Sequence, residues 1–199
     1  MPQLPPVTKA FMLACVGFFC LFILVPEWKP WLALWPISSG YFMPWQMVSY
    51  AFLHGDAMHL FFNMLGLWMF GSELEMVFGQ KRYLQLLVAS TLSAAAMQLL
   101  FAAVAPFFPA LFPYPIGPTV GASGALFGLL LGFGMLFPDR IIMPLFPPIP
   151  MKAKVFVAIF GALELLMGLS GASGVAHFAH LGGMIGAWLL LNHWRGGRR

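Results

Sequence analysis

Long apolar stretches alternate with short polar or proline-rich breaks along the whole chain. A helix that crosses the roughly 30 Å hydrocarbon core of a membrane needs about 20 such residues. Stretches of about that length predict six transmembrane helices, at residues 9–26, 56–79, 83–106, 121–137, 153–170 and 174–193. We therefore expect residues 1–199 to form a single all-α membrane domain, a bundle of six transmembrane helices.

The charged residues are few, and their distribution explains the net charge of +4. Hydrophobic residues make up 61% of the sequence and charged residues only 8%, against about 25% in soluble domains. If the helices alternate in direction from a cytoplasmic N-terminus, Lys29 lies outside and the other nine basic residues lie inside: Lys9, Lys81, Arg82, Arg140, Lys152, Lys154, Arg195, Arg198 and Arg199. This positive-inside pattern predicts cytoplasmic termini, a lipid bilayer as the surroundings, and no nucleic-acid partner.

The first connection, residues 27–55, is long and carries almost no charge. It contains five large aromatic residues with a polar atom: Trp28, Trp31, Trp35, Tyr41 and Trp45. Because tryptophan and tyrosine favour the membrane interface, we expect a membrane-associated loop in the outer leaflet. An ordinary extracellular loop is the alternative.

The fourth apolar segment is too short to span the bilayer from Ser123. Ser123 lies 16 residues before Asp139, which is expected at the cytoplasmic interface, and 16 residues of helix are about 24 Å long. The helix should therefore begin beneath the outer surface, directly after the proline-rich stretch 106–118. Non-helical backbone at that depth is tolerated only where it lines a cavity, so a cavity over Ser123 is predicted.

Other polar side chains enter from the same side of the membrane. Asp56 is a suitable N-cap, which places His59 at the third helical position and Asn63 one turn deeper on the same face. Ser173 could likewise cap the last segment, with His180 about 10 Å further down. Three segments would thus deliver one polar group each to a similar depth: Ser123, His180 and Asn63.

These groups fit serine hydrolysis. A serine hydroxyl needs a base to take its proton, and His180 is the natural base for Ser123. We expect a Ser–His dyad, since no carboxylate stands as an obvious third member. Backbone N–H groups at the helix start, with Asn63 and His59, would form an oxyanion hole, and Gly121 would keep the backbone uncrowded. No cofactor and no metal is expected.

Two alternatives concern the same chemistry. Gly171–Gly174 repeats the Gly-Ala-Ser-Gly of Gly121–Gly124, so Ser173 could pair with His177 four residues later. His177 could also replace His180 as the base, because it lies one turn away on the same helix.

The combined pattern resembles the rhomboid family of intramembrane serine proteases, across all six segments. The residues that carry the resemblance are His54, His59 and Asn63, then Glu75 and Gly79, then Gly121–Gly124, and finally His180 with Gly183 and Ala187. The resemblance favours His180 over His177. It implies a rhomboid-like bundle in a bacterial plasma membrane that cleaves transmembrane helices of substrate proteins near their outer end, with His54 helping to line a polar pocket.

Three positions depart from the family pattern. Gln46 stands in place of an arginine after Trp45, which bears on how the first loop is anchored. Phe127 replaces a frequent tyrosine and still offers an aromatic face to the histidine, and Ala187 stands where glycine is common. None of these changes removes a catalytic group, so an active enzyme is expected.

Three rival classes remain. A catalytically silent rhomboid-like binding or escort protein would be expected to lack Ser123 or His180. A transporter would need a polar path, of which Glu164 is the main deep element; we expect it to be protonated or hydrogen-bonded in a structural role. A metalloenzyme lacks the His-Glu-x-x-His motif, although four histidines could gather a metal: His54, His59, His177 and His180.

Overall fold

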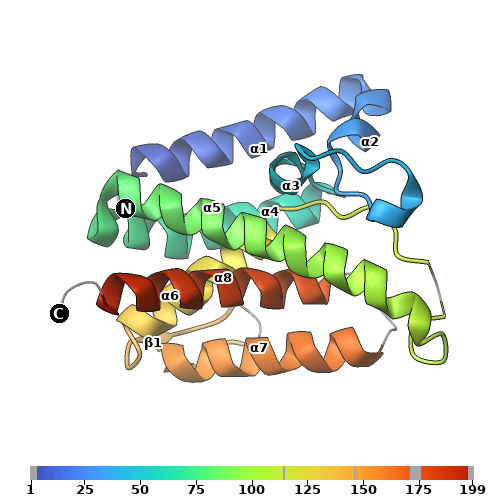
Figure 1. The fold of residues 1–199 in the computed structure, drawn as a ribbon. Helices are drawn as coiled ribbons and strands as arrows, with labels where there is room; N and C mark the ends of the chain where they lie inside the picture. Colours follow the sequence, from blue (N-terminus) through green and yellow to red (C-terminus); the bar gives the residue numbers. More distant parts are fainter. Residues whose placement is uncertain (1–3, 114, 146, 171–175, 197–199) are drawn as a thin grey trace.

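Helices form almost all of the regular structure in the computed structural model, which describes residues 4–113, 115–145, 147–170 and 176–196. The longer ones (Figure 1) are α1 (Pro6–Leu24), α4 (Ala57–Gly66), α5 (Ser72–Val104), α6 (Ser123–Leu136), α7 (Ala153–Ser170) and α8 (His177–Gly196). Within the described ranges, three helical stretches are long and apolar enough to cross a membrane: Pro6–Leu24, Ala57–Phe107 and Ala153–Ser170. The apolar helix α6 is shorter than these. The expectation of a mostly helical protein with membrane-length helices is confirmed.

The chain between residues 57 and 104 turns back on itself at Gly79. α4, the π-helical turn η4 (Leu67–Gly71) and α5 follow one another without a loop, but Gly79 has φ 73° and ψ 163°. This conformation is open almost only to glycine. The later part of α5 therefore runs back across the molecule beside α1 and α8 (Figure 1).

Glu75 caps the start of α1 from the neighbouring helix. The first turn of any α-helix has N–H groups without partners inside the helix, and the cap position of α1 makes no side-chain hydrogen bond. The buried Glu75 carboxylate accepts from the N–H of Val7 at 2.9 Å and from the N–H and hydroxyl of Thr8 at 2.7 and 2.8 Å. Its charge also suits the positive end of the α1 dipole, so this contact fixes α1 against α5.

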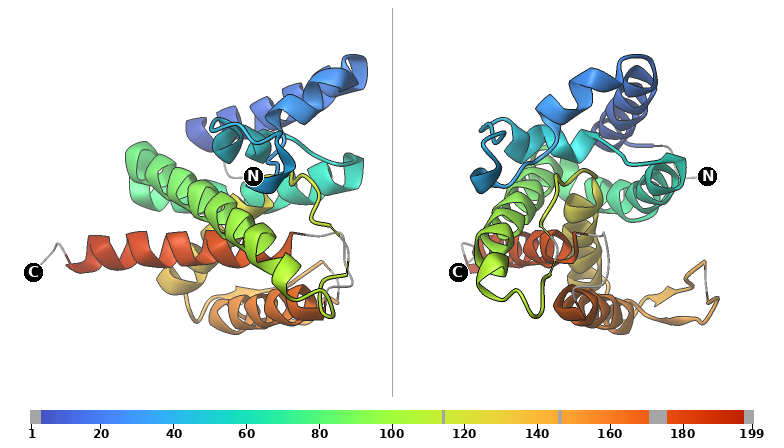
Figure 2. Two further views of the ribbon diagram at one scale, coloured as in Figure 1. Left: turned by 45° about the vertical axis from the view of Figure 1, so that its right-hand side comes forward. Right: turned by 90° about the vertical axis from the view of Figure 1, so that its right-hand side faces the viewer.

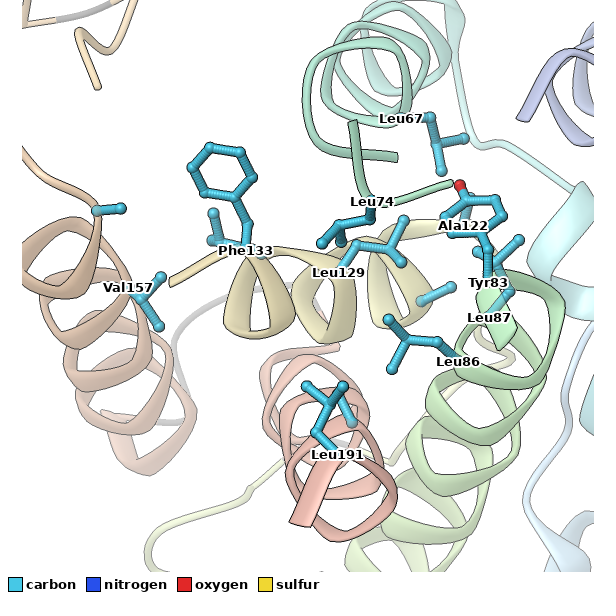
Figure 3. Close-up of a cluster of buried hydrophobic side chains, with 14 of the residues drawn as sticks. Leu67, Leu74, Tyr83, Leu86, Leu87, Ala122, Leu129, Phe133, Val157 and Leu191 are labelled. Carbon is cyan, nitrogen blue, oxygen red and sulfur yellow. The ribbon is translucent and has the colours of Figure 1, made fainter. Parts of the chain in front are cut away.

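α6 lies at the centre of the bundle (Figure 3), between α4, α5, α7 and α8. Its glycines let the backbones approach closely: a Cβ on Gly124 would stand 2.6 Å from that of Ala94 in α5. A Cβ on Gly183 of α8 would overlap the carbonyl oxygen of Gly124. These contacts hold α5, α6 and α8 together as one packed unit.

The first connection is folded rather than open. It contains five short helices: η1 (Pro26–Trp28), α2 (Lys29–Leu32), η2 (Ile37–Ser39), α3 (Gln46–Ser49) and η3 (Tyr50–Phe52). A further short helix, η5 (Ala105–Phe107), follows α5. The buried Gln46 side chain accepts from the N–H of Trp35 at 3.2 Å and donates to the carbonyls of Trp31 and Tyr41 at 3.3 and 3.0 Å. Gln46 thus anchors this loop in place of the charged residue expected from the resemblance.

The opposite end of the bundle carries a small hairpin and most of the charge. Strands β1 (Ile141–Ile142) and β2 (Met151–Lys152) pair antiparallel and project from the bundle (Figure 2). Asp139 pairs with Lys152 and Lys154 at 3.1 and 3.0 Å, and the hydrogen bond from Lys154 is the main reason that the pKa of Asp139 is lowered. The start of α1 and the end of α8 lie at this same end (Figure 1).

Candidate active site

The chain before Ser123 is held in an extended form by the first loop. Thr119 exchanges two backbone hydrogen bonds with Leu34, at 3.0 and 2.8 Å, and the N–H of Gly121 donates to the carbonyl of Tyr50 at 2.9 Å. Gly121 has φ 131°, a region that side-chain-bearing residues rarely adopt. The helix α6 then begins at Ser123 itself, as expected for a serine at a helix N-terminus.

Ser123 and His180 are in direct contact. The Nε2 atom of His180 lies 2.8 Å from the Ser123 hydroxyl oxygen, although the two residues are 57 positions apart in sequence. The His180 ring is stacked on Phe127, with ring centroids 4.3 Å apart and planes at 7°. Phe127 therefore supplies the aromatic face expected of it, and the ring of His180 is fixed edge-on to the serine.

A cavity of about 870 Å³ opens over this pair. Residues from α4, α5, α7, α8 and the extended chain before α6 line it, among them Asp56, His59, Gln98, Ser123, His177 and His180. The cavity predicted from the short fourth segment is present, and it connects the serine–histidine pair with His59.

His59 reaches the other side of Gly121. Asp56 caps α4 as predicted, because its carboxylate accepts from the N–H of His59 at 2.8 Å. A Cβ on Gly121 would stand 2.8 Å from His59 Nε2 and 3.4 Å from Ser123 Oγ. The absence of a side chain at Gly121 thus leaves a small space that is bounded by the serine oxygen and the imidazole of His59.

Asn63 and His54 contact His59. The Asn63 side-chain amide donates to the His59 carbonyl at 2.8 Å, one turn back in its own helix, and within the described residues it does not line the cavity. The His54 ring packs edge-on against that of His59, with centroids 5.1 Å apart. Burial lowers the pKa of His54 to about 4, so its ring is uncharged at neutral pH. In this structure both residues support His59.

Glu164 corrects the expectation that no carboxylate stands near the histidine. Its Oε2 atom lies 2.8 Å from Nδ1 of His180 and 2.6 Å from Nδ1 of His177. The sequence indicates only a deep Glu164 with a protonated or hydrogen-bonded structural role, because the rotation of α7 about its axis cannot be read from an apolar helix. The available signal was the presence of a lone acid in a span, which marks a functional group.

The histidines fall into two pairs instead of one cluster of four. Glu164, His177 and His180 do bring three metal-binding atoms within 4.8 Å of one another. The two oxygen–nitrogen separations are those of hydrogen bonds, whereas ligands bound to one zinc ion at about 2.0–2.2 Å stand further apart. The arrangement therefore favours hydrogen bonding over a metal site. Ser173, the other serine considered, lies outside the described residues.

Apolar helices around a half-buried serine and a buried histidine define an integral membrane protein with a polar site within its helical bundle. Residues 41–193 match the family model of the rhomboid domain. The chain is 31% identical over 195 residues to rhomboid protease GlpG of Yersinia pestis (strain Pestoides F) and of Yersinia enterocolitica serotype O:8 / biotype 1B. It is 30% identical to the same-named protein of Yersinia pseudotuberculosis serotype I (strain IP32953). The chain belongs to the rhomboid family.

The alignments leave part of the relatives unmatched. Each covers 96% of this chain and 63% of the relative, so the chain spans somewhat less than two thirds of their length. The family match includes Ser123, His180, His59 and Glu164.

Proposed function

We propose that this chain is an intramembrane serine endopeptidase in which Ser123 is the nucleophile and His180 the general base. The observation that carries the proposal is the 2.8 Å contact between His180 Nε2 and Ser123 Oγ at the wall of a cavity inside an apolar bundle. A proton acceptor at this distance activates a serine hydroxyl for attack on a peptide carbonyl. The protease names of the relatives support the same activity.

The attack can be followed atom by atom. As Ser123 Oγ bonds to the carbonyl carbon, its proton passes to His180 Nε2, which later gives it to the leaving amine. Water then enters from the cavity, gives a proton to His180 and bonds to the acyl carbon. His180 returns that proton to Ser123 Oγ as the bond between Ser123 and the acyl carbon breaks, and the product leaves as a carboxylic acid. The cycle needs one serine and one histidine and returns both to their starting forms.

His59 is placed to stabilise the negative oxygen that forms during the attack. The N–H of Gly55 points at His59 Nδ1, 3.4 Å away, so Nδ1 is the acceptor and the proton of the neutral ring resides on Nε2. That N–H faces the small space above Gly121, beside Ser123 Oγ. Together with the free backbone N–H groups of the α6 start, it forms the oxyanion hole in this proposal.

Features at the two ends of the bundle support the expected membrane orientation. Six crossings with both termini in the cytoplasm agree with the common end of the α1 start and the α8 terminus (Figure 1). Basic side chains gather there: Arg82 lies 5.5 Å over the Trp194 ring, and Arg195 donates to the Met135 carbonyl. The cavity then faces the extracytoplasmic side of a bacterial plasma membrane, with the aromatic first loop in the outer leaflet.

The expected substrates are proteins with transmembrane helices. A helical peptide bond is closed to attack by its own backbone, so the substrate must unwind before its carbonyl reaches Ser123. Small or helix-breaking residues near the cleavage point make unwinding easier, and the extracytoplasmic end of the substrate helix is closest to the cavity.

The test is cleavage of a single-pass model substrate by the purified protein in liposomes. Ser123→Ala and His180→Ala should each abolish cleavage, and a fluorophosphonate should label Ser123. Ser173→Ala is the matched control, because Ser173 stands in an identical four-residue motif, and it should cleave like the wild type. Full activity of Ser123→Ala would overturn the proposal. Binding of substrate without any cleavage would instead support an escort function.

A further inference from the structure

We infer that Glu164 is a positioning residue for His180, so that the Ser–His pair acts as part of a four-residue chain with His177. The inference rests on the proposed function. Glu164 comes from α7, whereas both histidines come from the first turn of α8. Its side chain is 13% exposed, and those of His177 and His180 are 5% and 8% exposed. Two helices therefore enclose a carboxylate together with both of its partners.

The contact with Glu164 fixes which nitrogen of His180 carries the proton. A carboxylate oxygen 2.8 Å from Nδ1 accepts a hydrogen bond from an N–H at that atom. Neutral imidazole has a single N–H, so Nε2 is left as the acceptor that faces the Ser123 hydroxyl. This is the form that a general base requires, and the opposite form would present an N–H to the serine oxygen.

The same carboxylate also favours His180 once it has taken up the proton. A buried negative charge in contact with Nδ1 stabilises the imidazolium that forms during the attack. Burial of a carboxylate inside an apolar bundle is unfavourable unless donors satisfy it. His177 supplies the second donor, since its Nδ1 lies 2.6 Å from the same oxygen atom. His177 thereby holds Glu164 in place.

The alternative is a purely structural role, in which the hydrogen bonds of Glu164 only hold α7 against α8. α7 has other contacts for that purpose: Val157 packs against Gly134 of α6, and Met184 of α8 packs against Gly161. Its outer face is apolar and exposed, at Leu163, Leu166 and Leu169 among others. Loss of a purely structural contact would lower the Tm, whereas loss of a positioning residue lowers kcat, and the two effects can be measured separately.

The experiment compares substitutions at Glu164 with a packing control on the same helix. Glu164→Leu should lower kcat for the model transmembrane substrate by about 100-fold, and Glu164→Gln by at least about tenfold, with KM within about twofold. Glu164→Asp keeps the charge on a shorter side chain and should recover part of the loss. Val157→Ala removes packing between α7 and α6 away from the site, so it should lower the Tm and leave kcat unchanged.

Two further readouts separate this inference from the proposed function. The rate of fluorophosphonate labelling should fall in Glu164→Leu in step with kcat, while Ser123→Ala is not labelled at all. In ¹⁵N spectra of the imidazole groups, His180 should carry its proton on Nδ1 in the wild type and be a mixture in Glu164→Leu. Wild-type kcat and labelling rate in Glu164→Gln and Glu164→Leu would overturn the role of Glu164 alone. If Val157→Ala lost as much kcat as Glu164→Leu at an equal loss of Tm, the role of Glu164 would be overturned too.

Discussion

The middle and C-terminal part of α6 packs into the apolar core, whereas at its N-terminal end one side of the same helix faces a cavity. Leu129 and Phe133 are 0% and 4% exposed within an apolar core (Figure 3). Ser123 begins the helix beside His180 and the cavity. Close packing stabilises the first region, and incomplete packing gives the second the room that substrate and water need.

The two regions are joined by the glycine contact between α6 and α8. Gly124 follows Ser123 directly, and Gly183 lies one turn after His180. Because the backbones touch at these glycines, the distance from the serine to the histidine is set by helix packing. The geometry of the reactive pair is therefore a consequence of the apolar core, and the comparison can be tested from either side.

The largest effect is expected where packing and chemistry meet. In Gly183→Val the new side chain would overlap the Gly124 carbonyl, and overpacking of this kind destabilises by about 1–3 kcal/mol or more. We expect both a lower Tm and the loss of cleavage, since α8 must move away from α6. Thermal unfolding in detergent and cleavage in liposomes measure the two effects.

Gly17→Val is the matched control for this prediction. Among the described residues nothing lies within 4 Å of a Cβ at Gly17, which is in α1. The same substitution there should leave Tm and activity nearly unchanged. Wild-type activity of Gly183→Val would show that the serine–histidine distance does not depend on this packing.

A change confined to the cavity should reduce turnover and leave the fold intact. His59→Ala removes the N–H placed above Gly121, and the loss of one oxyanion donor lowers kcat by about 10²–10³-fold. Its Tm should stay close to that of the wild type, because His59 faces the cavity. Met58→Ala, which truncates the exposed neighbour, serves as the control. Unchanged kcat in His59→Ala would exclude His59 from the oxyanion hole.

Much of this arrangement follows from local features of the sequence. Hydrophobic runs indicate the helices, the proline-rich stretch predicts that Ser123 starts one, and Asp56 is recognisable as a cap. Each of these depends on neighbouring residues alone. Helix rise also fixes how far each polar group lies from the surface, so the meeting of Ser123 with His180 can be predicted from their similar depths.

The features that the sequence did not reveal depend on the rotation of a helix about its own axis and on contacts between residues far apart in the sequence. α7 is apolar all round, so its sequence does not indicate that Glu164 faces α8. Similarly, nothing near Gln46 indicates that its amide joins Trp31, Trp35 and Tyr41. Both are single polar residues in apolar surroundings. A single polar residue in apolar surroundings should be expected to have a hydrogen-bond partner that the sequence does not identify.

The smallest predicted effect concerns acid stability at the cavity end. Burial lowers the pKa of His54 from 6.5 to about 4, so between these values the unfolded chain binds a proton that the folded chain does not. Stability therefore rises with pH across that window and is lost as the pH falls from 6.5 towards 4. The proton would place a positive charge beside the ring of His59. In His54→Gln the Tm should depend less on pH in this window than in the wild type, while Asp139→Asn, a change at the charged far end, should not flatten it there. Equal pH dependence of the Tm in His54→Gln and the wild type would mean that protonation of His54 does not contribute to the loss of stability in acid.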